Sequence, residues 1–136
     1  NMNTVSLEPG SLDAATSLNA LYLPGVNPLE VLRRLHAGLK PGGRLVVTGP
    51  TSPESFALAG PRIQADLERE GVLADPENRA QFEAVARTNR WLLPEAGNYW
   101  SVEGMVALLQ EIGFRRIVVA DTRLYYGYSF LVAADK

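Results

Sequence analysis

The sequence predicts an α/β fold whose sheet contains parallel strands. The main observation is the order of elements over residues 12–49, where a short strand, an amphipathic helix and an apolar strand follow one another. A helix of this length is sufficient for the right-handed crossover between neighbouring parallel strands. The second strand, residues 44–49, is almost continuously apolar, which is typical of a strand in a sheet that is covered on both faces.

The helix of this unit has recognisable ends. Asn27 suits the N-cap, Pro28 the first helical position and Glu30 the reciprocal position of a capping box. One apolar stripe at helical spacing consists of Leu29, Leu32, Leu35, His36 and Leu39. The segment Lys-Pro-Gly-Gly at 40–43 is expected to end the helix, because proline cannot continue it and glycine permits a tight reversal.

Residues 51–95 carry most of the charge and are expected to form a helical cap that is inserted into the domain. A first polar helix is predicted from Pro61 or Arg62 to Glu70, because proline is favoured at the first helical position. A second polar helix is predicted over residues 75–92. Its inward positions are expected to be Phe82, Val85, Ala86 and Leu92.

The C-terminal part adds one helix and two strands. Ser101 is a good N-cap for the helix, and Gly113 is expected in the left-handed position just after it. The apolar face of this helix is formed by Met105, Leu108, Leu109 and Ile112. The strands are predicted at 115–124 and 127–134, and one face of the last strand carries Tyr128, Phe130 and Val132.

The composition limits the classes of function. The 136 residues, 1–136, are interpreted as a single domain with a net charge of −2, no cysteine and one histidine. The absence of cysteine argues against disulfides and thiolate chemistry, and with a single histidine it also argues against a metal site. The basic residues are scattered, which argues against a nucleic-acid partner. No apolar run is long enough to span a membrane, and no signal peptide is recognised at the N-terminus. A cytoplasmic location is therefore expected.

Two segments carry a family resemblance. Residues 31–47 (Val-Leu-Arg-Arg-Leu-His-Ala-Gly-Leu-Lys-Pro-Gly-Gly-Arg-Leu-Val-Val) resemble the part of class I S-adenosylmethionine-dependent methyltransferases in which a helix ends in Leu-Lys-Pro-Gly-Gly and enters the fifth strand. Residues 100–114, from Trp-Ser to Gly-Phe, are similar to the helix that precedes the family's sixth strand. The resemblance implies an incomplete Rossmann-like methyltransferase sheet with strand order 4-5-7-6, in which strand 7 is antiparallel.

The same resemblance assigns candidate cofactor-binding residues. Residues 5–13 match the run that leads into the family's fourth strand, which places Asn1 and Met2 against the adenine ring. Leu18 and Asn19, just after that strand, would line the methionine end of S-adenosylmethionine. The family's glycine-rich loop has no counterpart here, because no Gly-x-Gly occurs in the sequence. We therefore expect little cofactor binding by the chain alone.

The resemblance also implies a partner. Strand four would be an exposed edge, and such edges pair with other strands. A homodimer or a second chain is expected to cover it.

Several candidate residues have more than one interpretation. Six aromatic residues are candidates for a pocket under the cap that binds an apolar or cationic small-molecule acceptor: Trp91, Tyr99, Trp100, Tyr125, Tyr126 and Tyr128. Trp100 and Tyr128 are expected in the core, and Trp91, Tyr99 and Tyr126 stay candidates for substrate binding. His36 and Asp13 are expected to be structural. Asn19 either contacts the ligand or caps a turn. No catalytic residue is identified.

Three functions remain open from the sequence. The chain is the C-terminal portion of a methyltransferase, a non-catalytic half-domain that binds or completes another chain, or a fragment without activity of its own.

Overall fold

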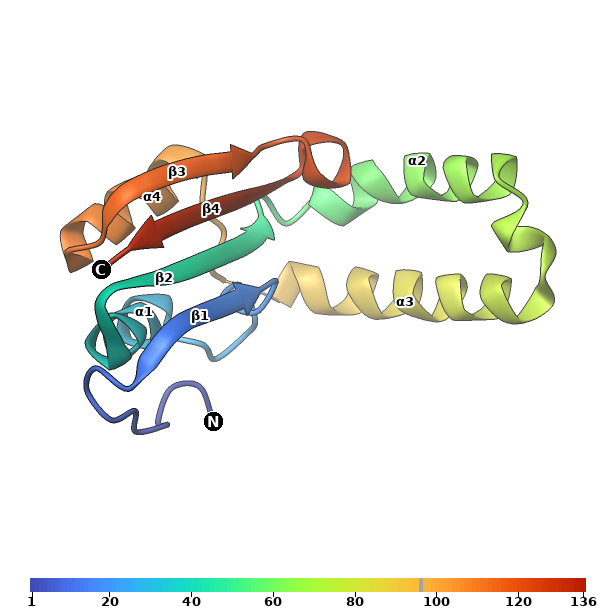
Figure 1. The fold of residues 1–136 in the computed structure, drawn as a ribbon. Helices are drawn as coiled ribbons and strands as arrows, with labels where there is room; N and C mark the ends of the chain where they lie inside the picture. Colours follow the sequence, from blue (N-terminus) through green and yellow to red (C-terminus); the bar gives the residue numbers. More distant parts are fainter. Residues whose placement is uncertain (96) are drawn as a thin grey trace.

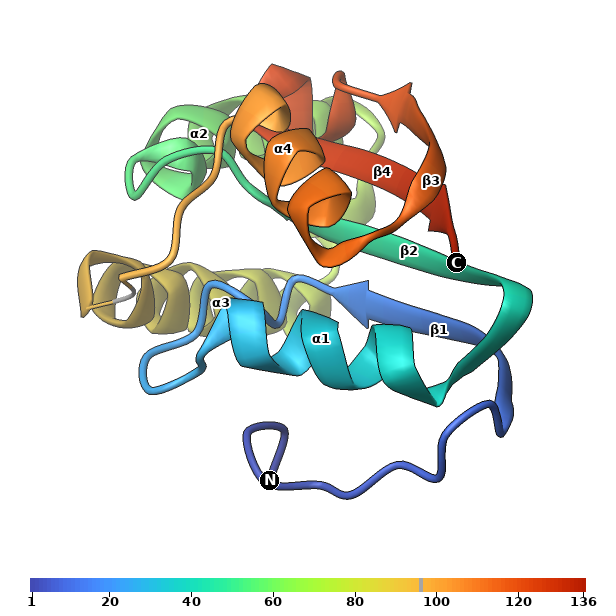
Figure 2. The ribbon, with the colours of Figure 1, turned by 90° about the vertical axis from the view of Figure 1, so that its left-hand side faces the viewer.

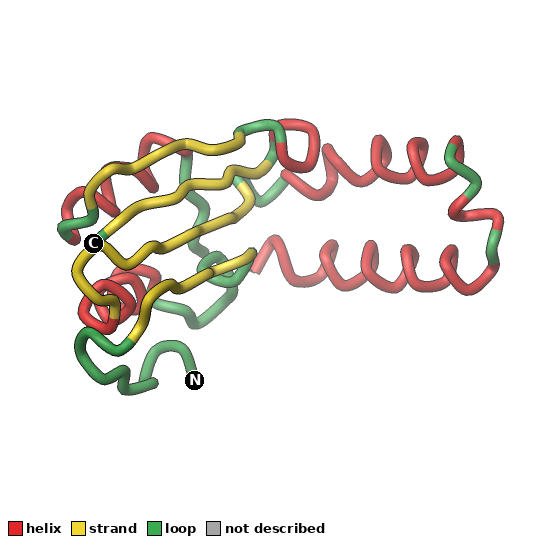
Figure 3. The backbone as a smooth tube through the Cα atoms, viewed as in Figure 1, coloured by secondary structure: helices red, strands yellow, loops and turns green. Residues whose placement is uncertain are grey.

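The structure, a computed structural model, describes residues 1–95 and 97–136, and the side chains of residues 1–88 and 97–136. The strands lie at one end of the molecule, and the helices of residues 55–69 and 76–95 project from that end (Figures 1 and 3). The elements in chain order are β1 (Leu12–Leu18), α1 (Pro28–Gly38), β2 (Leu39–Pro50), α2 (Ser55–Arg69), η1 (Val72–Ala74), α3 (Pro76–Glu95), α4 (Val102–Ile112), β3 (Arg115–Asp121), η2 (Leu124–Gly127) and β4 (Ser129–Asp135).

The sheet has the strand order β1-β2-β4-β3. β1 and β2 are parallel, whereas β4 runs antiparallel to both β2 and β3. The α/β fold class and the expected order 4-5-7-6 with an antiparallel strand 7 are thereby confirmed. β1 lies at the edge of this sheet. The prediction of a single domain over 1–136 with a cap at 51–95 remains a prediction.

Helix α1 begins as its sequence signals indicate. The side chain of Asn27 accepts a hydrogen bond from the backbone N–H of Glu30 at 3.2 Å, and Pro28 occupies the first turn. The end differs from the prediction, because β2 begins at Leu39 rather than at Arg44. Leu39 pairs with Leu12, and the backbone N–H of Lys136 donates to the carbonyl oxygen of Gly43 at 2.9 Å. Strand pairing on both sides therefore extends β2 through the Pro-Gly-Gly segment.

The hydrophobic core lies between α1, α4 and one face of the sheet. Both helices lie on the same side of the strands in Figures 1 and 2. The most deeply buried side chains are Leu32, Leu39, Leu45, Val47, Met105, Leu109, Phe130 and Val132. Trp100 packs against this cluster. Alternate residues of β2 and β4 thus face inward, as the period of two requires.

The opposite face of the sheet is open in the described part of the chain. Leu18 on β1 and Val118 on β3 have exposed fractions of 62% and 56%. Each is paired in register with a β2 or β4 residue whose side chain lies on the same face. The apolar character of strand 44–49 indicated cover on both faces, whereas α1 and α4 supply cover on one face only.

The cap consists of α2, η1 and α3, which extend beyond the carboxyl ends of β1 and β2. Helix α2 begins at Ser55, so the predicted start at Pro61 or Arg62 is wrong, and Pro61 lies inside the helix. An internal proline costs about 3 kcal/mol because one helical hydrogen bond is lost. Burial of Ala59 and Gly60 at the base of the cap favours the additional turns despite this cost.

Helix α3 covers nearly the predicted range. Phe82 and Ala86 are half-buried, as expected. Val85 also faces inward, but it lines a cavity between the two cap helices and is 56% exposed. The side chain of Leu92 lies outside the described residues.

The C-terminal strands are shorter than predicted. β3 ends at Asp121, and residues 124–127 form the short helix η2 before β4 begins at Ser129. Phe130, Val132 and Ala134 are buried on one face of β4, as the alternation predicts. No helix in the described ranges has the length and apolar character required to cross a membrane.

One carboxylate joins three strands of the sheet. Asp135 on β4 accepts two hydrogen bonds from Arg44 on β2, at 2.7 and 3.1 Å, and pairs with Arg116 on β3 at 3.0 Å. The hydrogen bonds from Arg44, together with the charge of Arg116, hold the pKa of Asp135 below its usual value.

An Asp135→Asn substitution tests this pairing through its pH dependence. The native state lowers the pKa of Asp135 from its usual value of about 3.9, so the pairing stabilises the fold fully above that pH. The stabilisation is lost as the pH falls through the lowered native pKa. In thermal unfolding, the variant should have a lower midpoint than the wild type at about pH 7, and the difference should shrink near pH 3. An equal difference at both pH values would contradict this assignment.

Candidate functional site

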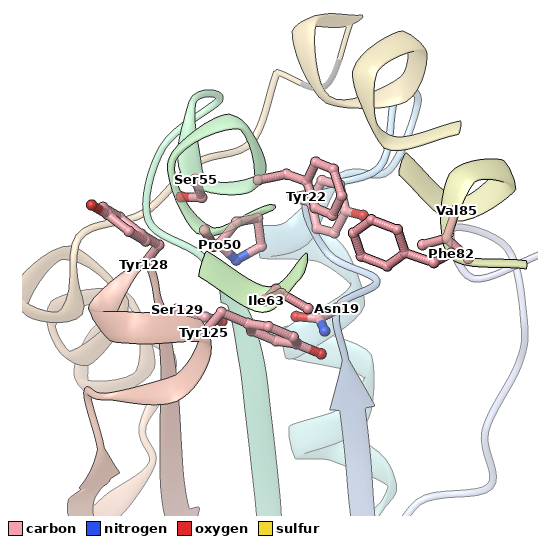
Figure 4. A pocket seen from close by; sticks show the side chains of 12 residues that line it. Asn19, Tyr22, Pro50, Ser55, Ile63, Phe82, Val85, Tyr125, Tyr128 and Ser129 are labelled. Carbon is pink, nitrogen blue, oxygen red and sulfur yellow. The ribbon is translucent and has the colours of Figure 1, made fainter. Parts of the chain in front are cut away.

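A cavity of about 290 Å³ lies where the carboxyl ends of β1 and β2 meet the base of the cap (Figure 4). Ligands of α/β proteins bind at this end of parallel strands. The lining residues come from the sheet end, both cap helices and η2, and they are Asn19, Tyr22, Pro50, Ser55, Phe56, Ala59, Ile63, Phe82, Val85, Tyr125, Tyr128 and Ser129. The cavity is therefore assembled from segments that are far apart in the sequence.

Asn19 is fixed at the end of β1 by hydrogen bonds to β2. Its backbone N–H donates to the carbonyl oxygen and to Oγ1 of Thr48, each at 3.1 Å. The Thr48 hydroxyl in turn donates to Oδ1 of Asn19 at 3.3 Å. Asn19 adopts a left-handed backbone with φ of 48°, a conformation that asparagine tolerates better than most residues. The strand end thus presents the Asn19 amide to the cavity.

Two consecutive tyrosines adopt an unusual backbone beside the cavity. Tyr125 and Tyr126 have φ values of 48° and 61°, in the left-handed region that bulky residues rarely occupy. Such residues cost about 1–3 kcal/mol each and are enriched at functional sites. The hydroxyl of Tyr126 donates to a carboxylate oxygen of Asp66 on α2, and the guanidinium of Arg62 lies 5.9 Å from the centre of its ring. These contacts attach the turn to the cap.

Tyr22 lies on the cavity wall near Tyr125. Its ring stacks on Tyr99 with centroids 6.2 Å apart. Burial, together with the neighbouring hydroxyl of Tyr125, raises the pKa of Tyr22 above its usual value of about 10. The hydroxyl of Tyr22 is therefore protonated at neutral pH and acts as a hydrogen-bond donor or acceptor rather than as a base.

A second hollow of about 190 Å³ lies beside β1, between the N-terminal segment and α1. It is lined by Met2, Val5, Leu7, Thr16, Ser17, Leu18, Ala20, Val31, Arg34 and Leu35. The hydroxyl of Ser17 is buried there and has no hydrogen-bond partner within the described residues. A buried hydroxyl without a partner marks a place where a polar ligand group would be stabilised.

The predicted cofactor residues are divided between these two sites. Met2 and Leu18 line the hollow beside β1, whereas Asn19 lines the cavity under the cap. Asn1 is exposed, and its side chain accepts a hydrogen bond from the N–H of Asn3 at 2.9 Å. The alternative that Asn19 caps the following turn stays a prediction, because its side chain bonds Thr48 on the neighbouring strand β2.

The predicted substrate residues lie around the cavity rather than on its surface. Tyr99 supports Tyr22 by stacking, and Tyr126 anchors the turn to α2. The side chain of Trp91 lies outside the described residues. Sequence reasoning did not assign Tyr22 or Phe56, and Phe82 was expected only as an inward residue of the cap. Tyr125, one of the aromatic candidates, does line the cavity. The doublet of tyrosines at 125–126 was the available signal.

Asp13 and His36 take part in local contacts away from the cavity. Asp13 pairs with Lys40 at 2.7 Å, and the His36 ring meets Phe114 edge to face at 4.8 Å. Burial lowers the pKa of His36, and the charge of Lys136 lowers it further by a smaller amount. Within the part of the chain that the structure describes, no group of three or more acidic, histidine or cysteine side chains is arranged to hold a metal ion.

The sequence matches no model of a known protein family and no curated protein. Its fold, in contrast, is similar to solved methyltransferases. A S-adenosylmethionine-dependent methyltransferase of Thermotoga maritima is 18% identical with a TM-score of 0.58, and the match covers 99% of this chain and 61% of that one. Human N-acetylserotonin methyltransferase, solved with S-adenosylmethionine, is 16% identical with a TM-score of 0.57, over 100% of this chain and 32% of that one.

A third match is a Haloferax volcanii methyltransferase in complex with a methyltransferase activator. It is 12% identical with a TM-score of 0.57, and the match covers 99% of this chain and 58% of that chain. The chain therefore spans between about a third and three fifths of the lengths of these three proteins. At these identities the similarity establishes a shared fold, which is the Rossmann-like methyltransferase fold.

A double-mutant cycle tests the attachment of the tyrosine turn to the cap. Tyr126→Phe removes the donor and Asp66→Ala removes the acceptor of the charge-assisted hydrogen bond between η2 and α2. We expect a coupling of about 1 kcal/mol in the free energy of unfolding, measured by denaturant titration of the two single variants and the double variant. Tyr128→Phe is the matched control, because the Tyr128 side chain points away from the cavity (Figure 4). Strict additivity of the two substitutions would contradict the attachment.

Proposed function

We propose that this chain is the C-terminal portion of an S-adenosylmethionine-dependent methyltransferase that acts on a small molecule. The observation that carries the proposal is the cavity at the carboxyl ends of β1 and β2 in a sheet with the strand order of this fold. The similarity to solved methyltransferases supports it, as does the resemblance of residues 31–47 and 100–114 to class I members.

The residues of the hollow beside β1 fit part of the cofactor. The unpartnered hydroxyl of Ser17 and the apolar side chains of Met2 and Leu18 offer one polar and two apolar contacts. These residues would hold the cofactor next to the strand end, and Asn19 would face the acceptor on the other side. No Gly-x-Gly, the pattern of the family's cofactor loop, occurs in the sequence, and we propose that a second chain or further polypeptide completes the site.

The chemistry follows from this arrangement. When bound, S-adenosylmethionine supplies an electrophilic methyl group, which bonds to a lone pair of the acceptor while the C–S electron pair moves to sulfur and the acceptor proton passes to solvent. The described residues contribute position and a water-poor wall rather than an ionised catalytic group. This account requires no catalytic residue.

The sheet supports a partner for the same site. β1 is an edge strand, and Leu18 at its end is exposed. We expect a homodimer or a second chain to cover this edge, because exposed apolar edges pair with other strands. The alternative function is a non-catalytic half-domain that completes another methyltransferase. The match to a methyltransferase that was solved with an activator supports this alternative.

The test is calorimetric titration of S-adenosylhomocysteine into the purified 136-residue chain, with the mass in solution measured by light scattering. The expected result is weak or undetectable binding to the monomer and one-to-one binding to an assembly in which β1 is covered. A tight complex with a monomer would show that the chain needs no partner. Absence of binding in every assembly would reject the methyltransferase function.

A second test introduces a charged side chain into the hollow beside β1. The affinity for S-adenosylhomocysteine is then measured in the assembly that binds it. Leu18→Asp should lower the affinity at least about tenfold, because a carboxylate would replace an apolar contact. Leu18 is exposed, so the fold should persist. Val72→Asp at the tip of the cap, also an exposed position, is the matched control and should leave the affinity unchanged. Equal affinity of the Leu18→Asp variant and the wild type would exclude this hollow as the cofactor site.

A further inference from the structure

The described residues in the wall of the cavity under the cap are uncharged. None of the described lining residues is an aspartate, glutamate, lysine, arginine or histidine. An ionised ligand group transferred from water into such a site loses hydration without gaining an opposite charge, and this is strongly unfavourable. Arg62, which precedes the lining residue Ile63 on α2, lies over the ring of Tyr126. The wall therefore favours a ligand without formal charge.

The size and shape of the cavity favour a flat ring system. Its volume of about 290 Å³ lies at the lower end of the range for small-molecule pockets, roughly 300–1,000 Å³. Phe56 and Ile63 on α2 and Phe82 and Val85 on α3 supply apolar contacts from the two cap helices. Tyr22 and Phe82 lie beside each other in Figure 4 and present ring faces. Aromatic walls bind aromatic ligands by offset or edge-to-face contacts.

The polar groups of the cavity gather at one end. Asn19 and Tyr125 extend into the same part of the cavity in Figure 4, and the hydroxyl of Tyr125 is close enough to Tyr22 to affect its pKa.

The hydroxyls of the two lining serines are engaged elsewhere. Ser129 donates to the carbonyl oxygen of Gly49 at 2.6 Å, and Ser55 accepts from the N–H of Ser52 at 3.0 Å. Hydrogen bonds to a ligand are therefore available mainly at the Asn19 end, next to the sheet. A single polar group of the ligand would be placed there.

The described lining also lacks a general base. It holds no carboxylate or imidazole, and the raised pKa of Tyr22 keeps that hydroxyl protonated. An acceptor hydroxyl in this cavity must lose its proton to water without assistance from these residues. A phenol, with a pKa of about 10 as in tyrosine, does so far more readily than an aliphatic alcohol. The chemistry of the wall thus selects among hydroxyl compounds.

From these observations we infer that the cavity binds an uncharged acceptor of one or two fused aromatic rings that carries a phenolic hydroxyl, with the hydroxyl at the Asn19–Tyr22–Tyr125 end. The identification of this ligand as a methyl acceptor rests on the proposed function. The preference for a neutral aromatic ligand rests on the cavity alone, and the two are tested separately.

Three ligands of equal ring size and different charge provide the experiment. 2-Naphthol, 2-naphthoate and 2-naphthylmethylammonium are titrated into the chain at neutral pH by calorimetry. 2-Naphthol should bind at least about tenfold more tightly than either ion, because the wall offers no counter-charge. Equal or tighter binding of the ammonium ion would indicate a cationic acceptor held by the aromatic rings. That result, tighter binding of the carboxylate, or no binding of 2-naphthol would each overturn the inference.

Two variants locate the ligand. Val85→Lys places a cation at an exposed position of the wall and should weaken 2-naphthol while strengthening 2-naphthoate, which reverses their order. Ile63→Ala should weaken 2-naphthol by several-fold through lost apolar contact, whereas Leu58→Ala, an exposed position on the same helix outside the cavity, should not. An unchanged order in Val85→Lys would place the ligand outside this cavity.

The ligand series distinguishes the inference from the proposed function. Selective binding of 2-naphthol without binding of S-adenosylhomocysteine in any assembly would retain the neutral aromatic ligand and reject methyl transfer. The opposite outcome is that the chain binds S-adenosylhomocysteine and also binds the ammonium ion more tightly than 2-naphthol. This outcome would retain methyl transfer and reject the phenolic acceptor.

Discussion

The position of β4 between β2 and β3 determines the site. Because β4 runs antiparallel to β2, the segment that precedes it arrives at the carboxyl end of β2. Since β1 is parallel to β2, its last residues reach the same end. Tyr125 and Asn19, which are separated by most of the chain, therefore border one cavity. A fourth strand parallel to β2 would place its preceding turn at the opposite end, where no cap lies.

Local signals predicted much of the fold, and non-local pairing explains the errors. The caps at Asn27 and Ser101 are formed by side chains three residues from the groups they bind, so the sequence contains the whole interaction. The start of β2 depends on partners at both ends of the chain, including Lys136, and no local pattern encodes them. Pro61 gave a local start signal for α2 that burial of Ala59 at the base of the cap overrides.

The site was less predictable than the fold. Asn19 could be identified because the end of a parallel strand is a general place for ligands, and it follows β1 directly. Tyr22 and Tyr125 are brought together by the fold, and the left-handed backbone of Tyr125 and Tyr126 contradicts the preferences of tyrosine. Such a conformation requires external support, which the contact of Tyr126 with Asp66 supplies. A sequence pattern cannot reveal a strained turn whose support comes from another helix.

The two kinds of cavity wall have different structural origins, and this has a consequence for specificity. The polar end of the cavity is formed by Asn19, which is bonded to β2, and by Tyr125, which belongs to η2. The apolar wall is formed by Phe56, Ile63 and Phe82 of the cap helices. Substitutions in the cap can therefore change the size of ligand that fits while the hydrogen-bonding end stays in register with the strands. The attachment of Tyr126 to α2 limits this independence, because a displacement of α2 would also move the turn that carries Tyr125.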